Sequence, residues 1–213
     1  MSTDSTQSLP PVGGSGRGAS SFLTIASPAS GEYSEKRSKF LAFALPVKTA
    51  EEAMAHVARF QKEYYDARHV CFAYMLGADR EVFRANDNGE PSGTAGKPIL
   101  GQINSRMLTD ILVVVVRYFG GVKLGTSGLI VAYRLATQAA LDNAEVVERT
   151  VDEQLTVSFG YLLMNSVMRI VKEEEPQILD QQFDNDCLLT LSIRKDKMPR
   201  LRERLSQVIK NKE

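Results

Sequence analysis

The hydrophobic pattern is strongest in the middle of the chain, where residues 111–116 are all apolar and do not alternate with polar positions. An unbroken apolar run of this length is typical of a strand that is covered on both faces of a sheet. Farther along, Leu129, Ala132, Tyr133 and Ala136 recur at helical spacing. The pattern therefore predicts a central strand, a glycine-rich turn and a long helix.

Apolar runs before this point predict the rest of a mixed α and β domain. Thr49 and Glu52 have the spacing of a capping box, and the apolar positions that follow them predict a helix with one buried face. The predicted strands lie at 22–25, 39–46, 69–76 and 81–85, and the predicted helices begin after Thr49 and at Pro98. The second pair of strands is predicted to form a hairpin that leads into the loop at 86–98.

The pattern changes after residue 143, and residues 145–150 are predicted to link two domains. Beyond them the chain alternates in a way that predicts strand, helix, strand, strand and helix. These elements are predicted at 154–159, 161–172, 178–183 and 187–194, with Asp196 as the cap of the last helix. This order is that of a ferredoxin-like split β-α-β fold without its final strand. We predict one domain at 22–146 and a second at 147–213.

Composition places the chain among ordinary globular proteins, with 43% hydrophobic residues and a formal net charge of zero. A nucleic-acid partner would therefore need a local basic patch, because non-specific affinity comes from neutralising phosphates. Residues 1–21 are rich in Ser, Thr, Gly and Pro and are predicted to form a disordered tail.

No run approaches the roughly 18 apolar residues of a membrane span, so a cytoplasmic location without membrane contact is expected. Cys71 and Cys187 lie in strand-like runs, which favours buried reduced thiols over a disulfide or a metal site. We expect neither a metal nor a cofactor.

The glycine-rich turn after the central strand is the first candidate site. A helix that begins after glycines leaves its first N–H groups unpaired and carries partial positive charge at that end, so a phosphate can bind there. Thr126 or Ser127 can cap this helix. The alternative to an anion site is a tight turn alone, in which Tyr118 and Phe119 close the end of the core and the two cations are solvated. The residues of this candidate site are Arg117, Tyr118, Gly120, Gly121, Lys123, Gly125, Thr126 and Ser127.

The loop at 86–98 is the second candidate. It is not a P-loop, because Pro91 and Pro98 stand where that pattern requires glycine and Ser or Thr. A backbone anion site is an open alternative here, formed by Gly93, Thr94 and Gly96 beside Lys97.

Polar side chains in and near this loop supply the residue types of an acid/base site, a Ser-His-Asp arrangement or a cation site. They are Asp66, His69, Asp87, Glu90 and Ser92. Ser92 lies outside a G-x-S-x-G elbow, however, and the sequence alone places none of these groups in contact. We favour a structural turn in which Asp87 and Glu90 accept backbone N–H bonds, and we predict no catalytic residue.

Three segments carry a resemblance to a known family. They are DARHVCFAY at 66–74, DNGEPSGTAGKPIL at 87–100 and RYFGGVKLGTSGLIVAY at 117–133, and their order and spacing resemble the IMPACT/YigZ family. Ser127 stands where many members have a glycine. The resemblance implies an α+β protein whose first domain has the fold of a small-subunit ribosomal protein's second domain and of domain four of elongation factor G. The second domain is expected to resemble domain five of that factor.

The resemblance also implies a role in translation, since eukaryotic relatives restrain the activation of a stress-responsive initiation-factor kinase. We expect a regulator without catalysis that binds RNA, the ribosome or another translation-system protein. Arg117, Lys123 and Lys97 would contact phosphate, and Tyr118 is a candidate for base stacking.

Two alternatives remain. One is an enzyme acting on a phosphorylated small molecule or nucleotide held by the two glycine-rich loops, and the other is a regulator that binds only proteins. A deep pocket between the loops would favour the enzyme, a convex basic ridge would favour RNA, and an exposed apolar patch would favour a protein partner.

Overall fold

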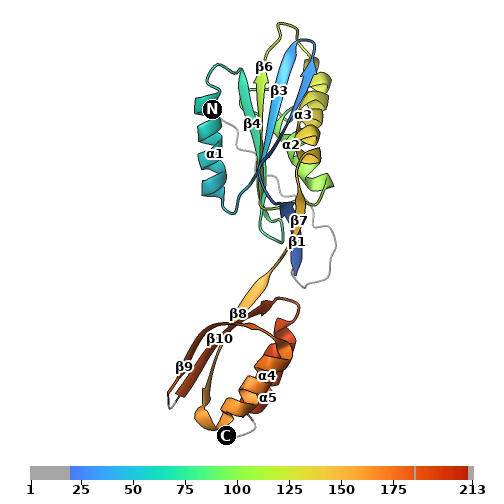
Figure 1. Ribbon diagram of the computed structural model, residues 1–213. Coiled ribbons are helices and arrows are strands. Elements are labelled where there is room, and N and C mark those ends of the chain that lie inside the picture. Colours follow the sequence, from blue (N-terminus) through green and yellow to red (C-terminus); the bar gives the residue numbers. More distant parts are fainter. Residues whose placement is uncertain (1–19, 185, 211–213) are drawn as a thin grey trace. The chain divides into compact units, whose positions relative to one another are not determined.

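The computed structural model describes residues 20–184 and 186–210, which separate into two compact units (Figure 1). Among the described residues, the first unit runs from Phe22 to Arg149, and the second consists of residues 20–21 together with the chain from Thr150 onward. The tail predicted at 1–21 lies outside the described residues except for its last two, of which Ser21 already belongs to a strand. The predicted boundary between residues 146 and 147 falls inside strand β7 (Val146–Thr150).

A five-stranded antiparallel sheet forms the centre of the first unit, in the order β2-β3-β6-β4-β5. Its strands are β2 (Ala29–Glu35), β3 (Ser38–Pro46), β4 (His69–Leu76), β5 (Val82–Asn86) and β6 (Ile111–Tyr118). The prediction of a central strand is confirmed, since β6 lies in the middle of the sheet. Figure 1 shows α1 (Ala50–Glu63) on one side of the sheet and α2 (Gly96–Ser105) and α3 (Gly125–Asp142) on the other.

Side chains of β6 alternate between two hydrophobic clusters. Val113 and Val115 join the cluster that includes α2 and α3, whereas Val114 and Val116 join the cluster that includes α1. Because successive side chains of a strand point to opposite faces, a strand covered on both sides is apolar at every position. This arrangement explains the unbroken apolar run in the sequence.

The start of α1 follows from its capping residues. Thr49 is the N-cap, and its side-chain oxygen accepts a hydrogen bond from the Glu52 N–H at 3.1 Å. The Glu52 carboxylate in turn accepts the N–H of Lys48 at 2.8 Å. The predicted cap is therefore confirmed, with the reciprocal bond made one residue earlier than in the standard capping box.

Two strands differ from the sequence prediction. β2 was not expected, and residues 145–150, predicted as a linker, contain β7, which pairs with β1 (Ser21–Ile25) in a two-stranded sheet. Both strands are half-buried at most. β2 has Tyr33 as its one large apolar residue, and β7 has only the valines at its first two positions, so neither gives a strong hydrophobic signal. Lys36 and Arg37 join β2 to β3 with φ values of 44° and 65°, the positive values of a tight type I′ hairpin turn.

A three-stranded antiparallel sheet in the order β8-β10-β9 forms the second unit, and one hydrophobic cluster joins it to its helices. Its elements are β8 (Asp152–Gly160), the 3-10 turn η1 (Tyr161–Leu163), α4 (Met164–Glu174), β9 (Gln177–Phe183), β10 (Asp186–Arg194) and α5 (Met198–Lys210). The predicted order of strand, helix, strand, strand and helix is confirmed.

The predicted cap of the last helix is wrong. Helix α5 begins at Met198, two residues after Asp196, and the Asp196 carboxylate instead pairs with Arg194 at 3.1 Å. The reason is a turn in which the Lys197 N–H bonds back to the Arg194 carbonyl oxygen, so the helix starts later than the sequence indicates.

Cys71 and Cys187 are buried free thiols, as predicted. Within residues 20–184 and 186–210, no helix has the length and apolar character needed to cross a membrane.

Gly31 provides a test of how closely β2 packs on α3. A Cβ at this position would lie 2.4 Å from the backbone carbonyl carbon of Ala139, so Gly31→Ala is expected to destabilise the protein by about 1–3 kcal/mol. Urea unfolding followed by circular dichroism measures the change. Gly101→Ala is the matched control, because its Cβ would meet no atom within 4 Å and alanine is the better helix former. Equal effects of the two substitutions would contradict the packing.

Candidate functional site

The loop between β5 and α2 is held by a single carboxylate. Asp87 Oδ1 accepts the N–H groups of Ala95 at 2.9 Å and Gly96 at 2.8 Å, and Oδ2 accepts that of Gly93 at 2.8 Å. The predicted structural turn is confirmed for Asp87. The backbone anion site predicted in this loop is wrong, because its N–H groups at Gly93 and Gly96 already bind this carboxylate, and that of Thr94 binds the Pro91 carbonyl oxygen.

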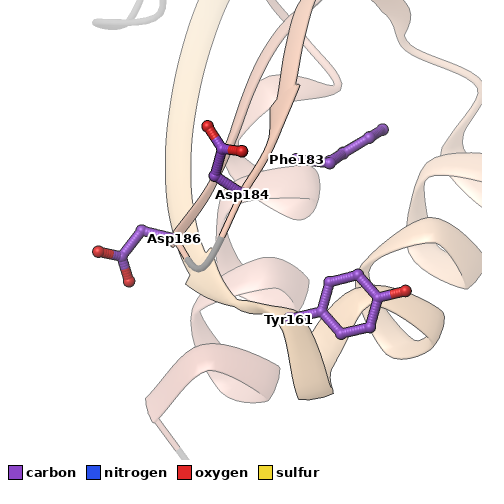
Figure 2. Close-up of a pocket in the computed structure, with 4 residues that line it drawn as sticks. All are labelled: Tyr161, Phe183, Asp184 and Asp186. Carbon is purple, nitrogen blue, oxygen red and sulfur yellow. The ribbon is translucent and has the colours of Figure 1, made fainter.

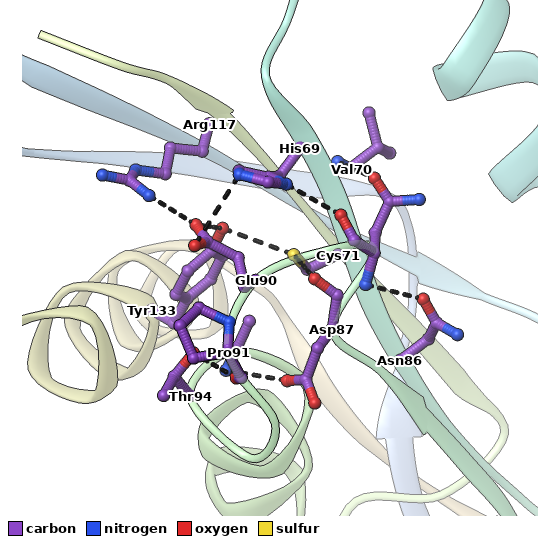
Figure 3. Close-up of polar contacts among 12 residues, drawn as sticks. His69, Val70, Cys71, Asn86, Asp87, Glu90, Pro91, Thr94, Arg117 and Tyr133 are labelled. Atoms are coloured by element: carbon purple, nitrogen blue, oxygen red, sulfur yellow. Dashed lines mark hydrogen bonds and ion pairs between the residues drawn. The ribbon is translucent and has the colours of Figure 1, made fainter. Parts of the chain in front are cut away.

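Glu90, in the same loop, is the centre of a buried polar network (Figure 3). Its Oε1 accepts hydrogen bonds from Arg117 Nη1 at 2.6 Å and from the Tyr133 hydroxyl at 2.8 Å. Its Oε2 lies 3.7 Å from His69 Nε2. Glu90 was predicted to accept backbone N–H bonds, and this is wrong, because its side chain faces Arg117 on β6 and Tyr133 on α3 instead.

Arg117 is buried because of its register in the sheet. Its Cα partners are Phe40 on β3 and His69 on β4, so it continues the same face of β6 as Val113 and Val115. Its guanidinium carbon lies 5.5 Å from the ring centroid of Phe40 and 5.6 Å from that of Phe119, and only 5% of the residue is exposed. A buried guanidinium needs a carboxylate partner, and Glu90 supplies it.

His69 and Cys71 complete the network from β4. His69 Nδ1 lies 2.7 Å from the carbonyl oxygen of Asn88, which can only accept, so Nδ1 carries the proton and Nε2 faces Glu90. Cys71 Sγ lies 3.0 Å from the Asp87 carbonyl oxygen and 3.3 Å from the Tyr133 hydroxyl. Burial raises the pKa of the Cys71 thiol and the pKa of the Tyr133 hydroxyl, so both stay protonated and neutral.

A cavity of about 640 Å³ opens beside this network. Its basic lining comes from Arg68, His69, Arg117 and Lys123, and the rest of its lining comes from Glu90, Pro91, Phe119, Leu124, Gly125, Thr126 and Leu129. Arg68 and Lys123 are exposed, and neither forms an ion pair with any described residue. The cavity therefore combines fixed buried charges with two cations that are free to meet a ligand.

Helix α3 begins at the edge of this cavity. Its first residue is Gly125, at φ +70°, and the preceding N-cap residue, Leu124, makes no side-chain cap. The prediction that Thr126 or Ser127 caps the helix is wrong, because both lie inside its first turn. The N–H groups of that turn are thus left without a side-chain acceptor, and they add partial positive charge to the cavity.

A second depression, of about 780 Å³, lies in the second unit and is lined by Tyr161, Phe183, Asp184 and Asp186 (Figure 2). Figure 2 shows the two carboxylates directed away from the two aromatic rings and from each other. Without converging polar groups this depression lacks the character of a ligand site, so the cavity in the first unit is the candidate.

Comparison with known proteins places the chain in a family. Residues 36–141 match the Impact N-terminal domain. The IMPACT family member YvyE of Bacillus subtilis is 36% identical over 155 residues, which cover 73% of this chain and 71% of YvyE. The chain belongs to the IMPACT family. The resemblance seen in the sequence is thereby confirmed.

Two further similarities extend over most of the chain. The IMPACT family member YigZ of Escherichia coli is 32% identical over 175 residues, covering 81% of this chain and 86% of YigZ. The crystal structure of a hypothetical protein is similar at 30% identity with a TM-score of 0.67, covering 89% of this chain and 93% of that one. The similarity therefore includes both units.

The structure brings only part of the predicted site together. Arg117, Lys123, Gly125 and Thr126 line the cavity with His69 and Glu90. Lys97, Ser92 and Ser127 are exposed and outside its lining, and Thr94 is buried with its hydroxyl bonded to the Pro91 carbonyl oxygen. Because Ser92 does not reach His69, the Ser-His-Asp alternative has no geometric support in this IMPACT protein.

Three residues of the predicted turn have other roles. The Tyr118 hydroxyl donates to Asp66 at 3.0 Å, which ties that ring to the other face of the sheet. A Cβ at Gly120 would lie 2.0 Å from the backbone carbonyl carbon of Arg37, so this glycine allows the turn to pack on the β2–β3 hairpin. Gly121 has φ +85°, a conformation that glycine adopts readily.

Sequence reasoning missed Arg68, Phe119 and Leu129 of the cavity and Tyr133 of the network. Phe119 directly follows Tyr118, and alternation along a strand places the two rings on opposite sides, which was the available signal. Tyr133 fits the helical period of α3 and was therefore interpreted only as a core residue. A buried tyrosine hydroxyl usually needs a hydrogen-bond partner, so the hydroxyl of Tyr133 indicated that a polar group lies beside it.

The ion pair of Glu90 and Arg117 can be tested by a double-mutant cycle. Glu90→Leu is expected to destabilise the protein by about 3–5 kcal/mol, because it leaves the Arg117 charge buried without a partner. Arg117→Met should be similarly costly, and the double variant should regain most of the loss, since no charge is then left uncompensated. Free energies of unfolding in urea give the coupling, and simple additivity of the single effects would show that the pair is not coupled.

Proposed function

We propose that this IMPACT protein is a translation-associated regulator that binds RNA through phosphate contacts in the cavity of the first unit and performs no catalysis. The observation that carries the proposal is the convergence of Arg68, Lys123 and the uncapped start of α3 on one concave surface. These are the groups by which proteins hold phosphate, namely mobile cations and N–H groups at a helix start.

Charge supports binding at this place. The chain has a formal net charge of zero, so it offers no general attraction to RNA and needs a local surplus of cations. Within the cavity the charge of Arg117 is balanced by Glu90, whereas Arg68 and Lys123 have no acidic partner among the described residues. The surplus is therefore two full charges, supplemented by the partial charge of α3.

The chain belongs to the IMPACT family, and resemblance to that family implies a role in the control of translation. This supports RNA or the ribosome as the ligand over other phosphate-containing molecules. In this proposal the first unit has the fold of the ribosomal-protein second domain and the second unit is ferredoxin-like. The order β8-β10-β9 supports the latter, since it is the order of the first three strands of that fold. We also propose a cytoplasmic location.

Catalysis is disfavoured by the state of the polar groups. Glu90 accepts two hydrogen bonds from buried donors, so its carboxylate is not an unengaged acid or base, and Ser92, the candidate nucleophile, makes no contact with His69. One observation favours an enzyme acting on a phosphorylated small molecule or nucleotide. The cavity joins the two glycine-rich loops and has the volume of a small-molecule site. Hydrolysis or transfer of phosphate esters by the purified protein would support the enzyme alternative.

Substitution of the two unpaired cations tests the proposal. Arg68→Ala and Lys123→Ala should each weaken binding to structured RNA and ribosomes, and each should lower the slope of log affinity against log salt by about one. The measurement is a fluorescence titration at several salt concentrations.

Lys48→Ala is the matched control, because it removes the same charge far from the cavity. Lys48 lies just beyond Pro46, which pairs with the first residue of β6, whereas the cavity lies at the opposite end of that strand. Unchanged affinity and slope in folded Arg68→Ala and Lys123→Ala proteins would overturn the proposed site.

A further inference from the structure

We propose that the cavity accommodates one terminal nucleotide, with its phosphate monoester at Arg68, Lys123 and the start of α3 and its base against Phe119. This inference rests on the proposed function and specifies its ligand. The chemistry is a phosphate monoester attached to a flat aromatic group, which an RNA end and a free nucleoside monophosphate share.

The charge of the cavity matches a terminal phosphate better than an internal one. A phosphate monoester carries about −1.5 to −2 charges at neutral pH, whereas each internal phosphodiester carries one. Arg68 and Lys123 supply two positive charges that no described acidic group neutralises. A monoester can balance both cations, while a diester would leave one of them without a counter-charge.

Several hydrogen-bond donors around the proposed phosphate position have no acceptor in the part of the chain that the structure describes. Helix α3 starts at Gly125 without a side-chain cap, and a Cβ at Gly125 would meet no atom within 4 Å, so the space beside this backbone is open. Independently, Arg117 lines the same cavity, is only 5% exposed, and its buried Nε has no hydrogen-bond partner. An unpaired buried donor of this kind is uncommon, and it shows that the Arg117 guanidinium at the wall of this cavity has hydrogen-bonding capacity that Glu90 does not use.

Phe119 supplies a surface for the base. Its side chain lines the cavity and is 47% exposed, although it directly follows a buried strand. An exposed aromatic ring beside phosphate-binding cations is the combination by which proteins hold single nucleotides, since every base has a face that stacks. Leu129 and Pro91 add apolar lining on the same cavity.

The form of the site favours an end over a continuous strand. The volume of this cavity, about 640 Å³, falls in the size range of small-molecule sites. A strand that passed through would need a groove with cations repeated along it, whereas here the basic lining is gathered about one helix start.

The test compares one RNA oligonucleotide with a 5′-phosphate, a 3′-phosphate or hydroxyl groups at both ends, titrated against the full chain. A phosphorylated end is expected to bind about tenfold more tightly than the hydroxyl form. Adenosine monophosphate should compete with it, and adenosine should not. The two phosphorylated oligonucleotides show which end is used, and the monophosphate shows whether a free nucleotide suffices.

Two variants separate phosphate from base recognition. Phe119→Leu should weaken binding of adenosine monophosphate several-fold and leave that of inorganic phosphate unchanged, whereas Lys123→Ala should weaken both. Tyr161→Leu is the matched control, because it removes an exposed aromatic ring that lies outside the cavity.

The two histidines of the chain give a direct readout by NMR, since adenosine monophosphate should shift the ring signals of His69 in the cavity and leave those of His56 unchanged. The signals are assigned with His56→Gln.

Equal affinity for the three oligonucleotides would overturn this inference and leave the proposed function standing. If the unsubstituted protein bound none of the three oligonucleotides, the proposed function would be overturned as well. An unchanged His69 signal at saturating adenosine monophosphate would place the nucleotide elsewhere and also overturn the inference.

Discussion

The buried carboxylate of Glu90 is the constraint on which the first unit's site depends. A charged group that is almost wholly removed from water is tolerated only if partners satisfy it, and those partners are Arg117 on β6 and Tyr133 on α3. From β4, His69 holds the same loop by donating its Nδ1–H to the Asn88 carbonyl oxygen. Each contact fixes the loop at 87–96 relative to an element of the core. The walls of the cavity are therefore held by the same network that keeps its central charge paired.

The two glycine-rich loops have similar composition and opposite physical roles. In the loop between β5 and α2, the Asp87 carboxylate already accepts the N–H groups of Gly93, Ala95 and Gly96, so a side chain of the loop takes the place that an anion would occupy. In the turn before α3, no side chain caps the helix, and Lys123 has no acidic partner among the described residues. The N–H groups of Gly93, Ala95 and Gly96 are thus already occupied in the first loop, whereas those at the start of α3 are open to a ligand.

How much of this was predictable depends on whether the signal is local. The β6 run and the Thr49 cap were recognised because each is determined by neighbours in the sequence. β2 and β7 were missed because each has at most two large apolar residues and these do not alternate along the strand. Arg117 was interpreted as a surface cation. Only the register that pairs it with Phe40 and His69, far away in the chain, shows that it lies inside.

The three sequence segments by which the chain resembles its family meet at this network. His69 and Cys71 come from the first segment, Glu90 from the second, and Arg117 and Tyr133 from the third. Five of the residues that define the resemblance thus maintain a buried ion pair and its hydrogen bonds, which is a structural task. The groups left for a ligand, Arg68, Lys123 and Phe119, lie in the first and third segments on the outer side of the same network. These three segments therefore supply both the buried network that supports the cavity and the exposed side chains that line it. The partner is therefore to be sought through those outer groups and not through the buried carboxylate.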